Sequence, residues 1–156
     1  MSGDAERVPC RVRPAEEADL EAMIGLLRQL FALEVDFGAD PECQRRGLRS
    51  LLARPGQARV LVAEGAGAVR GMCSVQSVVS TAEGGLVGWL EDLVVAEGWR
   101  GRGLGRCLLR AACAWARQQG LSRLQLVADR SNAPARDFYW RQGWDSTQLV
   151  VLRRRL

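Results

Sequence analysis

The segment between Gly98 and Arg106 limits what this chain can fold into more than any other part of its sequence. It reads GWRGRGLGR and joins a largely apolar run, 86–95, to an amphipathic run in which apolar residues recur at Leu104, Leu108, Ala111 and Trp115. The pattern predicts a buried strand, a tight turn and a helix, because glycine allows sharp turns and close backbone approaches. Free N–H groups at the start of such a helix favour an anion, and the three arginines of the segment add positive charge. Residues 100–106 are therefore predicted to cradle a pyrophosphate.

Other phosphate-binding motifs fit this segment less well. A dinucleotide-binding G-x-G-x-x-G motif that starts at Gly101 would need its third glycine where Arg106 stands, and it belongs near the start of a larger parallel sheet. A P-loop needs a lysine followed by serine or threonine, and the chain contains no lysine. A tight turn before a capped helix is the remaining alternative, but it would not require three arginines in seven residues.

Hydrophobic periodicity and turn residues predict a single domain over residues 1–156 with a mixed α/β fold. The expected order is β-α-α-β-β-β-α-β-α-β, which implies a mostly antiparallel sheet flanked by helices and one parallel βαβ unit late in the chain. Apolar residues make up 47% and the net charge is +4, which excludes a disordered chain. No apolar run is long enough to span a bilayer, so we expect no membrane association. The strands are expected at 10–13, 58–64, 69–79, 86–95, 123–129 and 147–153, and the helices at about 16–35, 41–54, 104–120 and 132–142.

Two residue types are absent, and their absence restricts the chemistry. The chain has no histidine, the usual general base and the commonest metal ligand, and no lysine, which excludes Schiff-base chemistry. We therefore expect no metal site, and proton transfer through Asp, Glu, Cys, Tyr or water.

The five cysteines form no C-x-x-C pair, so we expect them to be reduced and buried in a cytoplasmic protein. The arginines are spread along the chain apart from the run 153–155, so we expect no nucleic-acid partner.

Two motifs in order make the chain resemble the GNAT superfamily of N-acetyltransferases. The first is R/Q-x-x-G-x-G/A between a strand and a long helix, matched by Arg100, Gly103 and Gly105. The second is N-x-x-A-x-x-F-Y followed by a glycine and an aromatic residue, matched by Asn132, Ala135, Phe138, Tyr139, Gly143 and Trp144. The opening Val12-Arg13-Pro14-Ala15, followed by Asp19, is also similar to the start of these proteins. The resemblance covers nearly the whole chain and implies the GNAT fold, with a splayed, mostly antiparallel sheet.

The resemblance implies an enzyme that takes an acetyl group from acetyl-CoA and needs no metal. Backbone groups of Leu93, Val94 and Val95 would hold the pantetheine arm and polarise the thioester carbonyl, where charge develops in the transition state. Tyr139 is the only tyrosine and falls on the general-acid position, where it would protonate the departing thiolate; without the motif, a packed tyrosine would be the simpler interpretation. Asn132 would contact the cofactor arm, and the pyrophosphate would lie against Arg100, Gly101, Arg102, Gly103, Leu104, Gly105 and Arg106.

Carboxylates are the leading candidates for the base that removes a proton from the acceptor amine. Glu91 is the predicted base, acting directly or through water, and Asp92 or water alone is the alternative. Strand alternation is expected to send the two side chains to opposite faces. The segment Leu90-Glu91-Asp92, followed by Val95, resembles that of diamine acetyltransferases, in which the Glu position serves as the base. A structural carboxylate paired with an arginine is the competing interpretation of Glu91.

An acidic group after the first predicted helix indicates a cationic acceptor. Glu34, Asp36 and Asp40 fall in the region that lines the acceptor site in the GNAT superfamily, and negative charge attracts amines; a solvated loop would carry the same residues. We expect a small cationic primary amine such as a polyamine, acetylated by direct transfer in a ternary complex, with a protein N-terminus or an aminoglycoside as other acceptors. A non-catalytic acyl-CoA sensor or interaction module is the alternative function. The strand expected at 147–153 would allow a homodimer.

Overall fold

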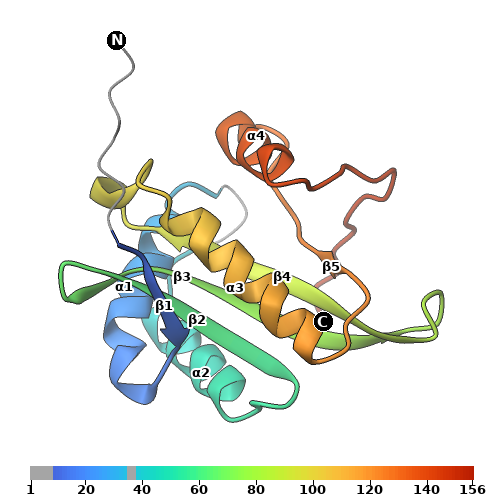
Figure 1. Ribbon diagram of the computed structural model, residues 1–156, viewed down its shortest axis with the longest axis horizontal. Coiled ribbons are helices and arrows are strands. Elements are labelled where there is room, and N and C mark those ends of the chain that lie inside the picture. The colour runs from blue at the N-terminus through green and yellow to red at the C-terminus, as the bar shows by residue number, and fades with distance from the viewer. Residues whose placement is uncertain (1–8, 35–37) are drawn as a thin grey trace. The chain divides into compact units, whose positions relative to one another are not determined.

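The computed structural model describes residues 9–34 and 38–156, and Figure 1 shows the course of the chain. It consists of two compact units, Met1–Gln125 and Leu126–Leu156, which we describe one at a time. The predicted acceptor residue Asp36 lies outside the described residues. Within the described ranges, no helix has both the length and the apolar content needed to cross a membrane.

A five-stranded sheet forms the centre of the first unit. Its strands are β1 (Arg11–Pro14), β2 (Ala58–Gly65), β3 (Ala68–Ser80), β4 (Gly85–Val95) and β5 (Leu124–Gln125). They lie in the order β1-β2-β3-β4-β5 and run antiparallel, except that β4 and β5 are parallel (Figure 1). This arrangement confirms the mostly antiparallel α/β fold and the late parallel unit. Strand β5 is shorter than the predicted 123–129, because its ladder to β4 reaches only Gly88 and Trp89.

Helices cover both faces of this sheet (Figure 1). They are the 3-10 turn η1 (Glu17–Asp19), α1 (Leu20–Phe31), α2 (Pro41–Leu52), the 3-10 turn η2 (Glu97–Trp99) and α3 (Leu104–Gln118). The predicted helix 16–35 is thus a 3-10 turn followed by a shorter α-helix. Helix α2 begins at Pro41 because the side chain of Asp40 accepts the N–H groups of Glu42 and Cys43, at 3.0 and 3.1 Å.

Because side chains alternate along a strand, the sheet packs against helices on both of its faces. Val60 and Val62 of β2 belong to the same buried cluster as Met23 of α1 and Leu48 of α2. The intervening Leu61 is also buried, and it points to the opposite face, which α3 covers. Helix α3 therefore closes the second half of the core, and its start, at the glycine segment, is fixed relative to the sheet.

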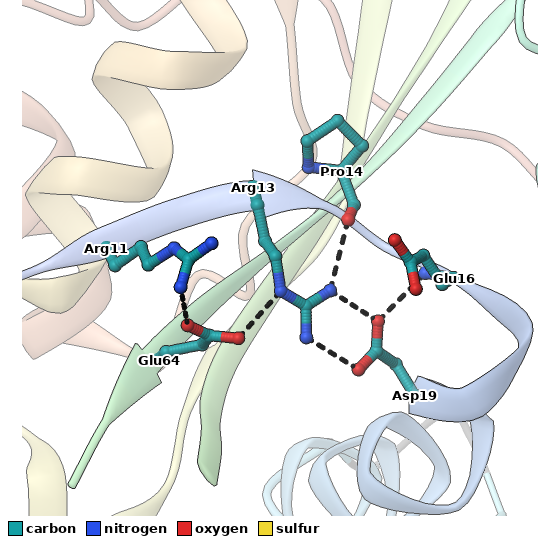
Figure 2. Close-up of polar contacts among 6 residues, drawn as sticks. All are labelled: Arg11, Arg13, Pro14, Glu16, Asp19 and Glu64. Atoms are coloured by element: carbon teal, nitrogen blue, oxygen red, sulfur yellow. Dashed lines mark hydrogen bonds and ion pairs between the residues drawn. The ribbon is translucent and has the colours of Figure 1, made fainter. Parts of the chain in front are cut away.

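A charged network joins the beginning of the first unit to the sheet (Figure 2). The guanidinium of Arg13 donates to both carboxylate oxygens of Asp19, at 2.7 and 2.9 Å, and to Glu64 of β2 at 2.7 Å. The N–H of Glu16 donates to Asp19 at 2.8 Å. Only 9% of the Asp19 side chain is exposed, and hydrogen bonding from Arg13 holds the pKa of its carboxyl below the usual value. Two residues of the N-terminal motif thus tie η1, and α1 after it, to β1 and β2.

The second unit contains one helix, α4 (Ala133–Arg141), within the described residues. Its N-cap is the predicted one, Asn132, whose side-chain oxygen accepts the N–H of Ala135 at 3.1 Å. The strand predicted at 147–153 is wrong, because residues 126–156 include no strand. Alternating apolar residues form a strand only where a neighbouring strand completes their hydrogen bonds, and this unit supplies none. The homodimer that this strand suggested stays a prediction.

Candidate active site

Strand β4 is bulged at Asp92 and Leu93. In its pairing with β3, Val94 lies opposite Met72 and Glu91 lies opposite Ser74. Asp92 and Leu93 therefore share the single partner position of Cys73. Asp92 has a φ of 55°, in the left-handed region that residues other than glycine, asparagine and aspartate seldom adopt. Bulges of this kind bend a strand and redirect side chains, often beside active sites. The bulge interrupts the simple alternation on which the expected orientation of Asp92 was based.

The carboxyl group of Asp92 is half-buried and electrostatically perturbed. Burial is the largest cause, and the negative charges of Glu91 and Glu34 add to it, so that the pKa of Asp92 rises to about 6. Glu34, which the sequence placed at the acceptor site, is therefore near enough to act on Asp92. The negative charges of Glu91 and Glu34 thus both act on the carboxyl group of Asp92.

Glu91, the predicted base, is exposed on β4. Its carboxylate accepts the indole N–H of Trp89 at 2.9 Å, and the hydroxyl of Ser74 donates to its backbone carbonyl at 3.4 Å. Among the described residues, no arginine forms an ion pair with Glu91. The carboxylate is thus oriented by a neutral donor.

The glycine segment forms the turn that the sequence predicted. Gly101 and Gly103 have φ values of 75° and 92°, in the left-handed region that glycine enters at no steric cost. Helix α3 begins directly after its N-cap, Gly103, and within residues 9–34 and 38–156 no side-chain cap of its first turn is present. The first N–H groups of α3 therefore remain for an anion, and the positive end of the helix dipole favours one.

Three exposed arginines surround this helix start. A Cβ at Gly103 would lie 3.9 Å from the Nη2 of Arg106, so that guanidinium is beside the turn. The Nε of Arg100 donates to the carbonyl of Val95 at 3.1 Å, which links the turn to the end of β4. Arg102 lies over the ring of Trp99. The predicted residues 91–95 and 100–106 therefore form one continuous stretch of the first unit, from the bulge to the start of α3.

Asn132 and Tyr139, the remaining predicted site residues, belong to the second unit. The side-chain oxygen of Asn132 is engaged as the cap of α4. The ring of Tyr139 packs edge-on against Phe138, with 5.4 Å between the ring centroids, and lies 5.8 Å from the ring of Trp144. These aromatic contacts orient Tyr139 within its unit, and its role as the acid stays a prediction.

Sequence reasoning missed two supports of this site. The bulge depends on pairing between β3 and β4, and its one local signal was an aspartate, a residue that tolerates left-handed backbone, in an apolar strand. The contact of Trp99 in η2 with Arg70 near the start of β3 joins residues far apart in the sequence, and no local pattern predicts it.

Comparison with known proteins gives one family and several relatives. The model of the Acetyltransferase (GNAT) family matches residues 27–144. The chain is 29% identical over 140 residues to the aminoalkylphosphonate N-acetyltransferase of Salmonella typhimurium, covering 90% of this chain and 88% of that protein. It is 46% identical over 55 residues to the streptothricin acetyltransferase of Streptomyces lavendulae, which is 35% of this chain but only 29% of that relative. The solved structure of an aminoglycoside acetyltransferase from an uncultured soil metagenomic sample shares the fold, with a TM-score of 0.76 and 21% identity over 94% of this chain and 96% of that one.

Proposed function

The chain belongs to the GNAT acetyltransferase family and is an N-acetyltransferase, and we propose that it moves an acetyl group from acetyl-CoA to the primary amine of a small cationic molecule. One observation carries this proposal: β4 leads from the bulge beside Glu91 and Asp92 directly into the arginine-rich turn at the uncapped start of α3. Carboxylates suit a cationic amine, and the helix start suits the phosphates of the donor. The similarity to proteins named as acetyltransferases favours turnover over a non-catalytic acyl-CoA sensor.

The donor is proposed to bind along residues 93–106. Acetyl-CoA supplies a thioester whose carbonyl carbon the amine attacks. Backbone groups of Leu93, Val94 and Val95 would hold the pantetheine arm and polarise that carbonyl. The first N–H groups of α3, together with the arginines of the turn, would hold the pyrophosphate, because the helix start carries partial positive charge and its N-cap, Gly103, has no side chain to occupy it. Asn132 would contact the cofactor arm through the amide nitrogen that its cap does not use.

Proton transfer is proposed to use one carboxylate and one phenol. The acceptor must be a neutral amine when it attacks, so Glu91 takes its proton, directly or through water, while Trp89 orients the carboxylate. Asp92, with a pKa of about 6, is ionised at neutral pH and is the alternative acceptor of that proton. Tyr139 gives a proton to the departing thiolate. The acetyl group passes directly from sulfur to nitrogen in a ternary complex.

The acceptor is proposed to be a small amine because negative charge gathers at the bulge. The negative charges of Glu91 and Glu34 both raise the pKa of Asp92, which supports a concentration of negative charge near the bulge. A polyamine matches such a field best. The relatives named for aminoalkylphosphonate and aminoglycoside substrates extend the class to other small molecules that carry an amine.

The test is release of the free CoA thiol from acetyl-CoA in the presence of an amine panel: a polyamine, an aminoglycoside, an aminoalkylphosphonate and a peptide with a free N-terminus. Thiol release with at least one small amine supports the proposal. Tyr139→Phe should lower kcat, and Glu91→Gln compared with Asp92→Asn identifies the base. Glu17→Gln, at an exposed carboxylate of η1, is the matched control and should change nothing. Binding of acetyl-CoA with no thiol release for any amine would instead support the sensor.

A further inference from the structure

Trp99, the last residue of η2, contacts two arginines from separate parts of the first unit. The guanidinium carbon of Arg70 lies 5.0 Å from the centroid of the ring, and that of Arg102 lies 4.9 Å from it. Arg70 stands on β3, whereas Arg102 stands in the glycine turn. Both distances are typical of cation–π contacts. The ring therefore connects the turn to the sheet.

Gly65, at the end of β2, makes room for this ring. A Cβ at Gly65 would lie 2.5 Å from Cζ3 and 2.9 Å from Cε3 of Trp99, closer than such atoms can approach. The Nε of Arg70 donates to the carbonyl of Gly65 at 3.3 Å, and the carbonyl of Arg70 accepts the N–H of Ala96 at 2.8 Å. The end of the β2–β3 hairpin is thus a seat for the ring, and any side chain at position 65 would push the ring away.

The contact with Trp99 leaves the donors of Arg102 available. A guanidinium carries its five N–H donors in its plane, and the contact with the ring is not a hydrogen bond, so these donors can still bind phosphate. The other side of the turn is also held, because the N–H of Glu97 donates to the side chain of Gln29 in α1 at 3.1 Å. An arginine that is already held loses less side-chain entropy when it binds a ligand than one that moves freely.

We propose that Trp99 is a positioning residue for the donor: seated on Gly65, its ring holds the guanidinium of Arg102 at the start of α3, where the guanidinium meets a phosphate group of the donor. Arg70, on β3, contacts the same ring and helps to hold it in place. This inference rests on the proposed use of acetyl-CoA, and it adds Trp99, Gly65 and Arg70 to the determinants of donor affinity.

Binding of acetyl-CoA by calorimetry tests the link between Trp99 and Arg102. Trp99→Leu should raise the Kd about fivefold, which is the value of one exposed cation–π contact, and Trp99→Phe should raise it less because an aromatic face remains. In the enzyme assay, the KM for acetyl-CoA should rise by the same factor while kcat stays unchanged.

The double variant Trp99→Leu/Arg102→Gln should bind no more weakly than Arg102→Gln alone. Arg117→Gln removes the same charge from an exposed site at the far end of α3 and is the matched control. If the effects of Trp99→Leu and Arg102→Gln multiply in the double variant, Trp99 does not act through Arg102 and the proposal is overturned.

Hydrogen exchange of the protein without donor tests the seat independently. Gly65→Ala should speed exchange of the backbone amides of residues 97–106, because the displaced ring no longer holds the turn. Gly85→Ala, at a strand end where a Cβ would meet nothing within 4 Å, should leave exchange unchanged. Unchanged exchange in Gly65→Ala would overturn the inference that Gly65 makes room for the ring of Trp99 and so holds the turn. Failure of the wild-type chain to bind acetyl-CoA would overturn the proposed function, and with it the role of Trp99 in donor binding, even where exchange responds as expected.

Discussion

Replacing Asp19 with asparagine should cost about 2–3 kcal/mol of the free energy of unfolding. The carboxylate accepts two hydrogen bonds from Arg13 and one from the N–H of Glu16, all within 2.9 Å, and 9% of the side chain is exposed. Removing one partner of a buried ion pair costs roughly 3–5 kcal/mol. The loss expected for Asp19→Asn lies at or below the lower end of this range, because a quarter of the Arg13 side chain is exposed and Arg13 keeps its bond to Glu64 (Figure 2).

Urea unfolding followed by circular dichroism measures this loss. For a chain of this size, 2–3 kcal/mol corresponds to a Tm lower by roughly 5–10 °C. The matched control is Glu17→Gln, because the ion pair of Glu17 with Arg49 has side chains that are 63% and 56% exposed. Breaking this exposed pair should cost less than about 1 kcal/mol. Equal losses in the two variants would refute the argument that burial, and not charge pairing as such, gives the Asp19 network its strength.

The same prediction has a pH dependence with a defined sign. The pKa of Asp19 is lowered in the folded state, so its ionised form stabilises the fold above the unfolded pKa of about 3.9. This stabilisation is lost as the pH falls through the folded pKa. The wild-type chain should therefore lose stability on acidification more steeply than Asp19→Asn. Parallel acid profiles for the two proteins would contradict the assignment.

Three further substitutions test the site and the core. Asp92→Asn should raise the KM for a cationic amine and remove a limb of the pH–rate profile near pH 6, because the Asp92 carboxyl, whose pKa is about 6, supplies its charge only above that value. The same variant should be more stable at neutral pH by about 1–2 kcal/mol, since it no longer carries a half-buried charge, and urea unfolding measures this gain. Leu108→Ala removes a fully buried side chain of α3, and it should cost roughly 2–5 kcal/mol in the same unfolding experiment. Gly88→Ala puts a Cβ 2.3 Å from the Cδ2 of Leu124, so it should loosen the β4–β5 ladder and cost about 1–3 kcal/mol, whereas Gly85→Ala should be nearly neutral.

Much of the fold could be predicted because its information is local. The amphipathic spacing after Gly103 and the apolar run before Gly98 required a strand, a turn and a helix, and the structure has them at 85–95 and 104–118. The cap of α4 by Asn132 is also local chemistry. The strand expected at 147–153 was wrong because strand formation depends on a partner, which no stretch of sequence reports by itself.

The details of the site depended on contacts between distant residues. The sequence marked Glu91 and Asp92 as unusual, but only the pairing with β3 shows the register shift that puts Asp92 in left-handed backbone. Likewise, the sequence marked Arg102 as a phosphate ligand, while its support by Trp99 and Gly65 required the end of the β2–β3 hairpin to be in place. Long-range register is the information that sequence periodicity lacks.

A calorimetric titration of the purified chain with acetyl-CoA, with ATP and NAD as controls, tests the central claim most directly. The account predicts saturable binding of one acetyl-CoA per chain, weakened in Arg102→Gln and preserved in Arg117→Gln. ATP and NAD also carry phosphates, but they lack the pantetheine arm that residues 93–95 are proposed to hold, so they should bind much more weakly. No binding of acetyl-CoA by a folded sample, or equal binding of ATP, would contradict the assignment of residues 93–106 as the donor site.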